Sequence, residues 1–199
     1  MARTVTPEGV ASARERIFRA AEQLFAEKGY DGTAIVEITE LAGVNRGLPF
    51  YYWKDKRALY AAVVEGGLGL FIRMAEETIS GLGTASERLA AFARGHLRLL
   101  WHQPLPMRVV DRCLLDGHVE ELGLGTLFRE TVARLEQLFQ RAADDGELRA
   151  VDPELAARVL LGPGFIFSMW RQFEGERFSE ERLAAFISDF LIHAFKRAE

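Results

Sequence analysis

Five side chains within residues 33–56 have the chemistry to bind a nucleic acid. Arg46 carries a guanidinium group that can donate two hydrogen bonds to a guanine edge or hold a backbone phosphate. Thr33, Tyr51, Tyr52 and Lys56 carry hydroxyl or ammonium groups that can donate to phosphates on either side. This combination favours a DNA-binding surface, and both interpretations of Arg46 remain open.

Two short helices joined by a tight turn must position these groups. The pattern predicts one helix over residues 33–42, with Thr33 as its cap and Gly43 as the turn that follows. Asn45 is a good N-cap for the next helix, which places Arg46 in its first turn. Pro49 would be the fourth helical residue, where the missing N–H has no intrahelical partner. This is the arrangement of a helix-turn-helix, whose second helix enters the DNA major groove.

The apolar side chains of this segment divide between packing and contact. Phe50 and Trp53 are predicted to lie in the core, and either Tyr51 or Tyr52 can also pack there with its hydroxyl hydrogen-bonded. Leu48 cannot donate to a phosphate but can contact a thymine methyl group. Packing within the domain is the preferred interpretation of Leu48.

Composition limits the kinds of protein that this chain can be. It has 199 residues and a net charge of -4, which argues against a protein that coats nucleic acid with a general basic surface. Residues 1–57 sum to +1 (nine Lys and Arg, eight acids) and residues 58–199 to -5 (sixteen and twenty-one). Cys113 is the sole cysteine, and no signal core or membrane span is evident. We therefore expect a cytoplasmic protein that contacts no membrane.

Apolar residues recur at spacings of three and four nearly throughout, which predicts an all-α chain of about nine helices. We expect a DNA-binding domain over residues 1–57, including an N-terminal arm over 1–11, and a larger helical body over 58–199. Beyond the helix-turn-helix, the predicted helices span 12–29, 55–79, 86–101, 107–116, 121–143, 153–172 and 179–196.

Two features of the body suggest specific roles. Gly66, Gly67 and Gly69 interrupt the helix predicted over 55–79, and a bend there is one hypothesis for how a signal is transmitted. The last two predicted helices have apolar faces that are wide for a monomer, which favours a subunit interface.

Enzyme chemistry finds no support in the sequence. The four histidines, His96, His102, His118 and His193, are widely spread and form no metal-binding pair with one another or with Cys113. The step Gly162-Pro-Gly164 lies inside an apolar helix and is interpreted as a kink. We expect no metal and no cofactor.

The chain resembles the TetR family of bacterial transcriptional repressors over residues 16–33, at Ile38, over 42–44 and over 51–59. The resemblance implies a homodimer with a three-helix DNA-binding head, a helical body that holds a small-molecule effector, and a four-helix interface built from the last two helices. It also implies a palindromic operator and a ligand-driven shift of the fourth helix that changes the separation of the two heads.

An effector pocket would be lined by inner residues of the body. Their aromatic rings and methionines suit an apolar or aromatic molecule, although ordinary core packing is the alternative for each of them. His96 and Arg108 are the polar candidates. The full set is Phe92, His96, Trp101, Met107, Arg108, Phe128, Phe165 and Met169.

Departures from the family pattern concern DNA specificity. Asn45 stands where the family usually has serine or threonine, and Leu48, Pro49 and Val36 also differ from the usual types. The operator sequence therefore does not follow from the resemblance. Two alternatives to a ligand-controlled repressor remain: a helical enzyme or interaction module that keeps the head, and an architectural DNA-binding protein.

Overall fold

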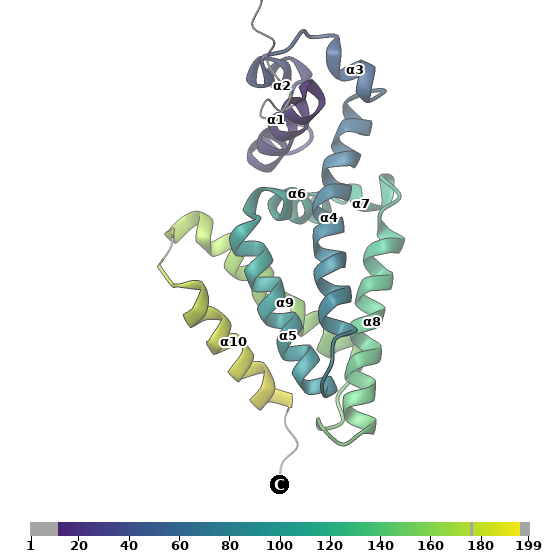
Figure 1. Cartoon of the computed structure of the whole chain (residues 1–199), viewed down its shortest axis with the longest axis vertical. Helices are drawn as coiled ribbons and strands as arrows, with labels where there is room; N and C mark the ends of the chain where they lie inside the picture. Colours follow the sequence, from purple (N-terminus) through teal and green to yellow (C-terminus); the bar gives the residue numbers. More distant parts are fainter. Residues whose placement is uncertain (1–11, 176, 196–199) are drawn as a thin grey trace, which may run out of the picture. The chain divides into compact units, whose positions relative to one another are not determined.

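The computed structural model describes residues 12–175 and 177–195, and its secondary structure consists of helices (Figure 1). Ten helices lie in these ranges, so the all-α prediction is confirmed. The helix beyond the nine predicted is the short α7, His118–Glu121. The chain forms two compact units, residues 1–64 and 65–199, and the division falls inside helix α4.

The first unit contains α1 (Ala13–Lys28), α2 (Ile35–Ala42), α3 (Leu48–Tyr52) and the start of α4 (Lys56–Ile79). Ser12 and Glu15 form a reciprocal capping box at the start of α1. The three helices α1, α2 and α3 contact one another. Their core includes Ile17, Phe25 and Ile38, which are completely buried.

The prediction that Thr33 caps the second helix is wrong. Its hydroxyl donates to the carbonyl oxygens of Leu24 and Gly29, at 3.1 and 2.7 Å, and the residue is 2 % exposed. Helix α2 begins at Ile35, and the Glu37 carboxylate accepts a hydrogen bond from the Ala34 N–H at 2.9 Å. The Thr33 hydroxyl donates to these carbonyl groups and not to the N–H groups of α2, because a buried polar group needs a hydrogen-bond partner.

The prediction that Asn45 caps the third helix is also wrong. Helix α3 begins at Leu48, and the Leu48 N–H donates to the Asn45 carbonyl oxygen at 3.0 Å within the preceding turn. Pro49 is therefore the second helical residue and not the fourth. Since proline is best tolerated at the first positions of a helix, the later start suits the sequence better.

Helix α4 runs without interruption across all three of its glycines. It begins after Asp55, whose carboxylate accepts a hydrogen bond from the Ala58 N–H at 2.8 Å. Gly67 faces α6 so closely that a Cβ atom would lie 2.7 Å from the Pro106 carbonyl oxygen. Close packing therefore explains this glycine, whereas bending at Gly66 remains a prediction.

Helix α4 is long and apolar enough to cross a membrane by length and composition. Its residues Leu59, Val63, Leu68 and Phe71 are buried within the described part of the chain. Core helices of globular proteins share this composition, so the finding gives no support to a membrane contact.

The second unit is built around α5 (Ala85–His102), which contacts α6 (Pro104–Leu115), α8 (Gly125–Asp144), α9 (Pro153–Glu174) and α10 (Glu180–Phe195) (Figure 1). Two boundaries differ from the prediction by more than two residues. Helix α6 starts at Pro104 because proline fits the first helical position. The helix predicted over 121–143 starts only at Gly125, because Gly123 has φ 74 and forms a turn.

Candidate DNA-binding surface and ligand cavity

The turn between α2 and α3 presents the Arg46 side chain to solvent. Gly43 ends α2 in the left-handed conformation, with φ 64 and ψ 45, which favours glycine. Arg46 lies in the turn before α3, not in its first turn, and its side chain is 80 % exposed. The nearest carboxylate is Glu40, with 3.9 Å between Nη2 and Oε1. An exposed pair at that distance contributes little, so the guanidinium can exchange Glu40 for another acceptor.

The aromatic residues of α3 divide differently from the prediction. Tyr51 is 81 % exposed, Tyr52 is also exposed, and their rings meet edge to face at 5.0 Å. Trp53 is buried, as predicted. The prediction that Phe50 lies in the core is wrong, because this short helix buries Pro49 and leaves Phe50 51 % exposed.

Lys56 occupies the first turn of α4, as predicted, with its Nζ 4.3 Å from the centre of the Tyr30 ring. This cation–π contact holds the ammonium group at a defined place. Thr33, in contrast, does not reach the surface, so its hydroxyl cannot contact a phosphate.

A hollow of about 450 Å³ lies beside this exposed segment. Gly43, Val44, Asn45 and Leu48 contribute to its lining. Leu48 is half-buried and Asn45 is exposed, so Leu48 packs in part while one side stays accessible. Its contact with a thymine methyl group stays a prediction.

The predicted effector residues of the second unit fall into separate groups. Phe92, His96 and Phe128 pack with Phe71 in an aromatic cluster, with centroid distances from the Phe71 ring of 6.1, 5.4 and 6.3 Å. Burial lowers the pKa of His96 to about 4, so the imidazole is neutral at pH 7. Gly164 of α9 allows this close packing, because a Cβ atom there would lie 2.6 Å from His96 Cε1.

Arg108, Phe165 and Met169, by contrast, line a cavity of about 330 Å³ between α6 and α9. Four of its lining residues were not among the predicted effector residues: Asp111, Arg112, Leu115 and Asp116. The spacing of Arg108, Asp111, Arg112 and Leu115 places them on one face of a helix, and this is the signal that could have identified them.

Asp111 is the most perturbed acid of the cavity. Burial raises its pKa to about 6, while a hydrogen bond from Ser168 and the charge of Arg108 act in the opposite direction. The Ser168 Oγ donates to Asp111 Oδ2 at 3.5 Å. The cavity thus offers apolar surface next to two guanidinium groups and the two carboxyl groups of Asp111 and Asp116.

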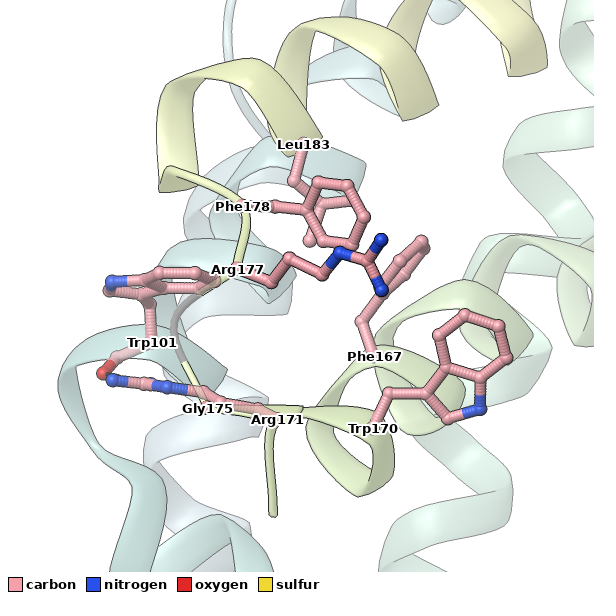
Figure 2. A pocket seen from close by; sticks show the side chains of 8 residues that line it. All are labelled: Trp101, Phe167, Trp170, Arg171, Gly175, Arg177, Phe178 and Leu183. Atoms are coloured by element: carbon pink, nitrogen blue, oxygen red, sulfur yellow. Dashed lines mark hydrogen bonds between the residues drawn. The ribbon is translucent and has the colours of Figure 1, made fainter. Parts of the chain in front are cut away.

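The remaining two candidates lie elsewhere in the second unit. Met107 is buried in the core, and Trp101 lines a different, narrower cavity (Figure 2). The predicted effector residues therefore do not form one site. Among the described residues, no group of three or more His, Cys, Asp or Glu side chains is arranged to hold a metal ion.

Helices α9 and α10 carry large apolar side chains that are exposed in the single chain. They include Val159, Ile166, Phe173, Phe186 and Phe190. This is the surface predicted for the subunit interface. Leu191, another apolar residue of the last predicted helix, lies outside the described side chains.

Sequence comparisons connect both units to known families. The model of bacterial regulatory proteins of the tetR family matches residues 17–63, and that of a tetracyclin repressor-like C-terminal domain matches residues 82–195. The fatty acid metabolism regulator protein of Bacillus subtilis is 34% identical over 149 residues, which are 74% of this chain and 77% of the relative. An HTH-type transcriptional repressor of Mycobacterium tuberculosis is 28% identical over 170 residues, or 84% and 76%.

Solved structures share the fold. AibR in complex with isovaleryl coenzyme A and operator DNA has a TM-score of 0.79 at 24% identity, covering 91% of this chain and 98% of that one. FadR from Bacillus subtilis in complex with stearoyl-CoA has a TM-score of 0.75 at 22% identity, covering 90% and 97%. With an exposed helix-turn-helix and family matches over both units, the chain belongs to the TetR family of bacterial transcriptional regulators.

Proposed function

We propose that this regulator is a homodimeric repressor that leaves its operator when a short-chain acyl thioester of coenzyme A binds in the body. The observation that carries the proposal is the cavity between α6 and α9, where Arg108 and Arg112 lie beside Phe165 and Met169. Residues 1–57 would bind DNA, and residues 58–199 would bind the effector and the second subunit.

The lining of the cavity has mixed charge, from two arginines and two aspartates, and it suits an amphipathic ligand. Phe165, Met169 and Leu115 provide apolar surface for an acyl chain, and the guanidinium groups of Arg108 and Arg112 provide donors for a phosphate. A volume of about 330 Å³ is at the lower end for ligand sites, which favours a short acyl group with the nucleotide part outside. The name of the Bacillus subtilis relative and the ligand of AibR support this class of effector.

We further propose that Arg46, Tyr51, Tyr52 and Lys56 contact the operator, with Asn45 and Leu48 at the edge of the same surface. Thr33 is not part of this surface, since its hydroxyl is buried. Arg46→Ala distinguishes the two roles of that side chain. Loss of a guanine contact would cost about 1–3 kcal/mol and relax specificity at one base pair, whereas loss of a phosphate contact would weaken all sequences alike and lower the salt slope by about one.

The experiment uses an operator selected from random DNA and fluorescence anisotropy at fixed salt. Isovaleryl-CoA should release the wild-type protein, and free coenzyme A should not. Arg108→Ala should need at least about tenfold more isovaleryl-CoA, because a charge-assisted hydrogen bond is lost. Arg141→Ala removes an exposed arginine of α8 that lines none of these cavities, and it should respond as the wild type does. Release that is insensitive to every acyl-CoA, or unchanged in Arg108→Ala, would contradict the proposal.

A further inference from the structure

The helix-turn-helix carries a carboxylate that the fold does not use. Three acids lie within residues 33–56, namely Glu37, Glu40 and Asp55. Glu37 accepts a hydrogen bond from the backbone before α2 at 2.9 Å, and Asp55 accepts one from the backbone at the start of α4 at 2.8 Å. Glu40 accepts no hydrogen bond from any residue that the structure describes, and its side chain is 69 % exposed. Local folding therefore does not explain why this residue is an acid.

Glu40 stands beside the side chain that is expected to contact DNA. Its Oε1 lies 3.9 Å from Arg46 Nη2, and both side chains extend into solvent. A Cβ atom added at Gly43 or at Gly47 would meet nothing within 4 Å. The turn that holds Arg46 is thus uncovered, so the edge of a base can approach both charged groups.

A carboxylate at this position works against non-specific binding. DNA attracts proteins through its phosphates, whatever the base sequence, and a negative charge beside a cation weakens that attraction. A phosphate at Arg46 would meet the Glu40 carboxylate as well as the guanidinium group. The acceptors on a guanine edge carry no full charge, so the carboxylate repels them less. Glu40 therefore favours the base-reading role of Arg46 over the phosphate-binding role.

The pair matches the edge of a G·C base pair in the major groove. Guanine offers the O6 and N7 acceptors that a guanidinium group binds, and cytosine offers an N4 amine that donates to a carboxylate. Guanine O6 and cytosine N4 are hydrogen-bonded to each other, so they lie about 2.9 Å apart. The 3.9 Å between Arg46 Nη2 and Glu40 Oε1 is close to this spacing. One base pair can therefore engage both side chains at once.

We propose that Glu40 is a specificity-determining residue, which accepts a hydrogen bond from a cytosine N4 amine while Arg46 binds the guanine of the same base pair. This rests on the proposed contact of Arg46 with the operator and adds a second reader to it. A homodimer would apply the pair once in each half-site. An A·T pair in the same orientation would place the thymine O4 acceptor against the carboxylate, so it would be rejected.

The test removes single functional groups from the DNA. An operator is selected from random DNA with the wild-type protein, and each G·C pair of a half-site is then modified in turn. 2-Pyrimidinone in place of cytosine removes only the 4-amino group, and 7-deazaguanine in place of guanine removes only the N7 acceptor. At one base pair, each modification should weaken wild-type binding at least about fivefold, measured by fluorescence anisotropy at fixed salt.

Matched variants identify the side chain that reads each group. In Glu40→Ala, 2-pyrimidinone should weaken binding no further, whereas 7-deazaguanine should still do so. Arg46→Ala should lose its response to 7-deazaguanine. Asp31→Asn is the control, because it removes one negative charge from an exposed residue of the same unit, outside the turn; it should respond to both modified bases as the wild type does. The thermal unfolding of Glu40→Ala should match that of the wild type.

Two results would overturn the proposal. In the first, Glu40→Ala binds operator and random DNA more tightly by the same factor, with a salt slope steeper by about one and an unchanged response to 2-pyrimidinone. The carboxylate would then act on phosphates alone. In the second, 2-pyrimidinone leaves wild-type binding unchanged at every base pair. If Arg46→Ala then also binds the operator as the wild type does, the operator contact of Arg46 fails too; if Arg46→Ala binds more weakly, that contact stands and only the role of Glu40 is refuted.

Discussion

Replacing Gly67 by alanine puts a methyl group into the contact between α4 and α6. The added carbon would lie 2.7 Å from the Pro106 carbonyl oxygen and 2.8 Å from Val110 Cγ2, well inside the separation of about 3.5–4 Å at which carbon atoms attract. The nearest atom is the backbone oxygen of Pro106, which cannot rotate away as a side chain can, so α6 itself would have to shift. Such overpacking costs about 1–3 kcal/mol, and alanine recovers about 1 kcal/mol of helix propensity. The net loss of stability should reach up to about 2 kcal/mol.

Gly66→Ala is the matched control, since Gly66 is the neighbouring residue of the same helix and is exposed. It gains the same propensity without the steric cost. The difference between the two variants should therefore be about 1–3 kcal/mol, or roughly 3–10 °C in the midpoint of thermal unfolding followed by circular dichroism. Equal stability of the two variants would refute the close approach. It would return all three glycines to the hypothesis that they serve bending.

Three other variants test buried polar groups. Thr33→Val should lower unfolding free energy by about 1–2 kcal/mol, with Thr33→Ser near wild type and the salt dependence of DNA binding unchanged. In the folded protein His96 stays neutral down to about pH 4, whereas in the unfolded chain it is protonated below about pH 6.5. The free energy of unfolding therefore decreases as the pH falls below about 6.5, by at most about 1.4 kcal/mol per pH unit. His96→Gln should remove this pH dependence. In the folded protein Asp111 keeps its proton up to about pH 6, whereas in the unfolded chain it ionises near pH 4. The free energy of unfolding therefore decreases as the pH rises from about 4 to 6. Asp111→Asn should stabilise the protein at pH 8 but not at pH 4. Urea denaturation from pH 4 to 8 measures both slopes, and parallel profiles for wild type and variants would contradict them.

The sequence predicted the helices of the first unit well because their signals are local. The capping box of Ser12 and Glu15 and the stop at Gly29 need only neighbouring residues. The errors at Thr33 and Asn45 have a common cause. Both residues are favourable caps, but the Thr33 hydroxyl donates to the carbonyl groups of Leu24 and Gly29, nine and four residues away, and the Asn45 carbonyl belongs to the turn before α3.

The candidate cavity was predicted only in part because residue type does not distinguish packing from lining. Phe92 and Phe165 are both aromatic residues of apolar helix faces, yet one is completely buried and the other borders the cavity. The outcome depends on how helices from distant parts of the chain meet, which periodicity does not encode. Charges at a three- and four-residue spacing would have been the better guide, since Arg108, Asp111 and Arg112 all line the cavity.

Helix α6 connects the two parts of the proposed mechanism. Pro106 and Val110 face Gly67, while Arg108 and Arg112 line the cavity, so the two pairs point about 200° apart on one helix. A ligand that binds Arg108 and Arg112 would contact one side of α6. The opposite side of α6 packs against Gly67 of α4, where there is no space for a methyl group. In the proposed mechanism, movement of α6 would pass to α4 at this contact, because close-packed contacts do not absorb displacement. Helix α4 is continuous from Lys56 to Ile79 and spans the division between the two units, so it is the element on which such a mechanism would depend.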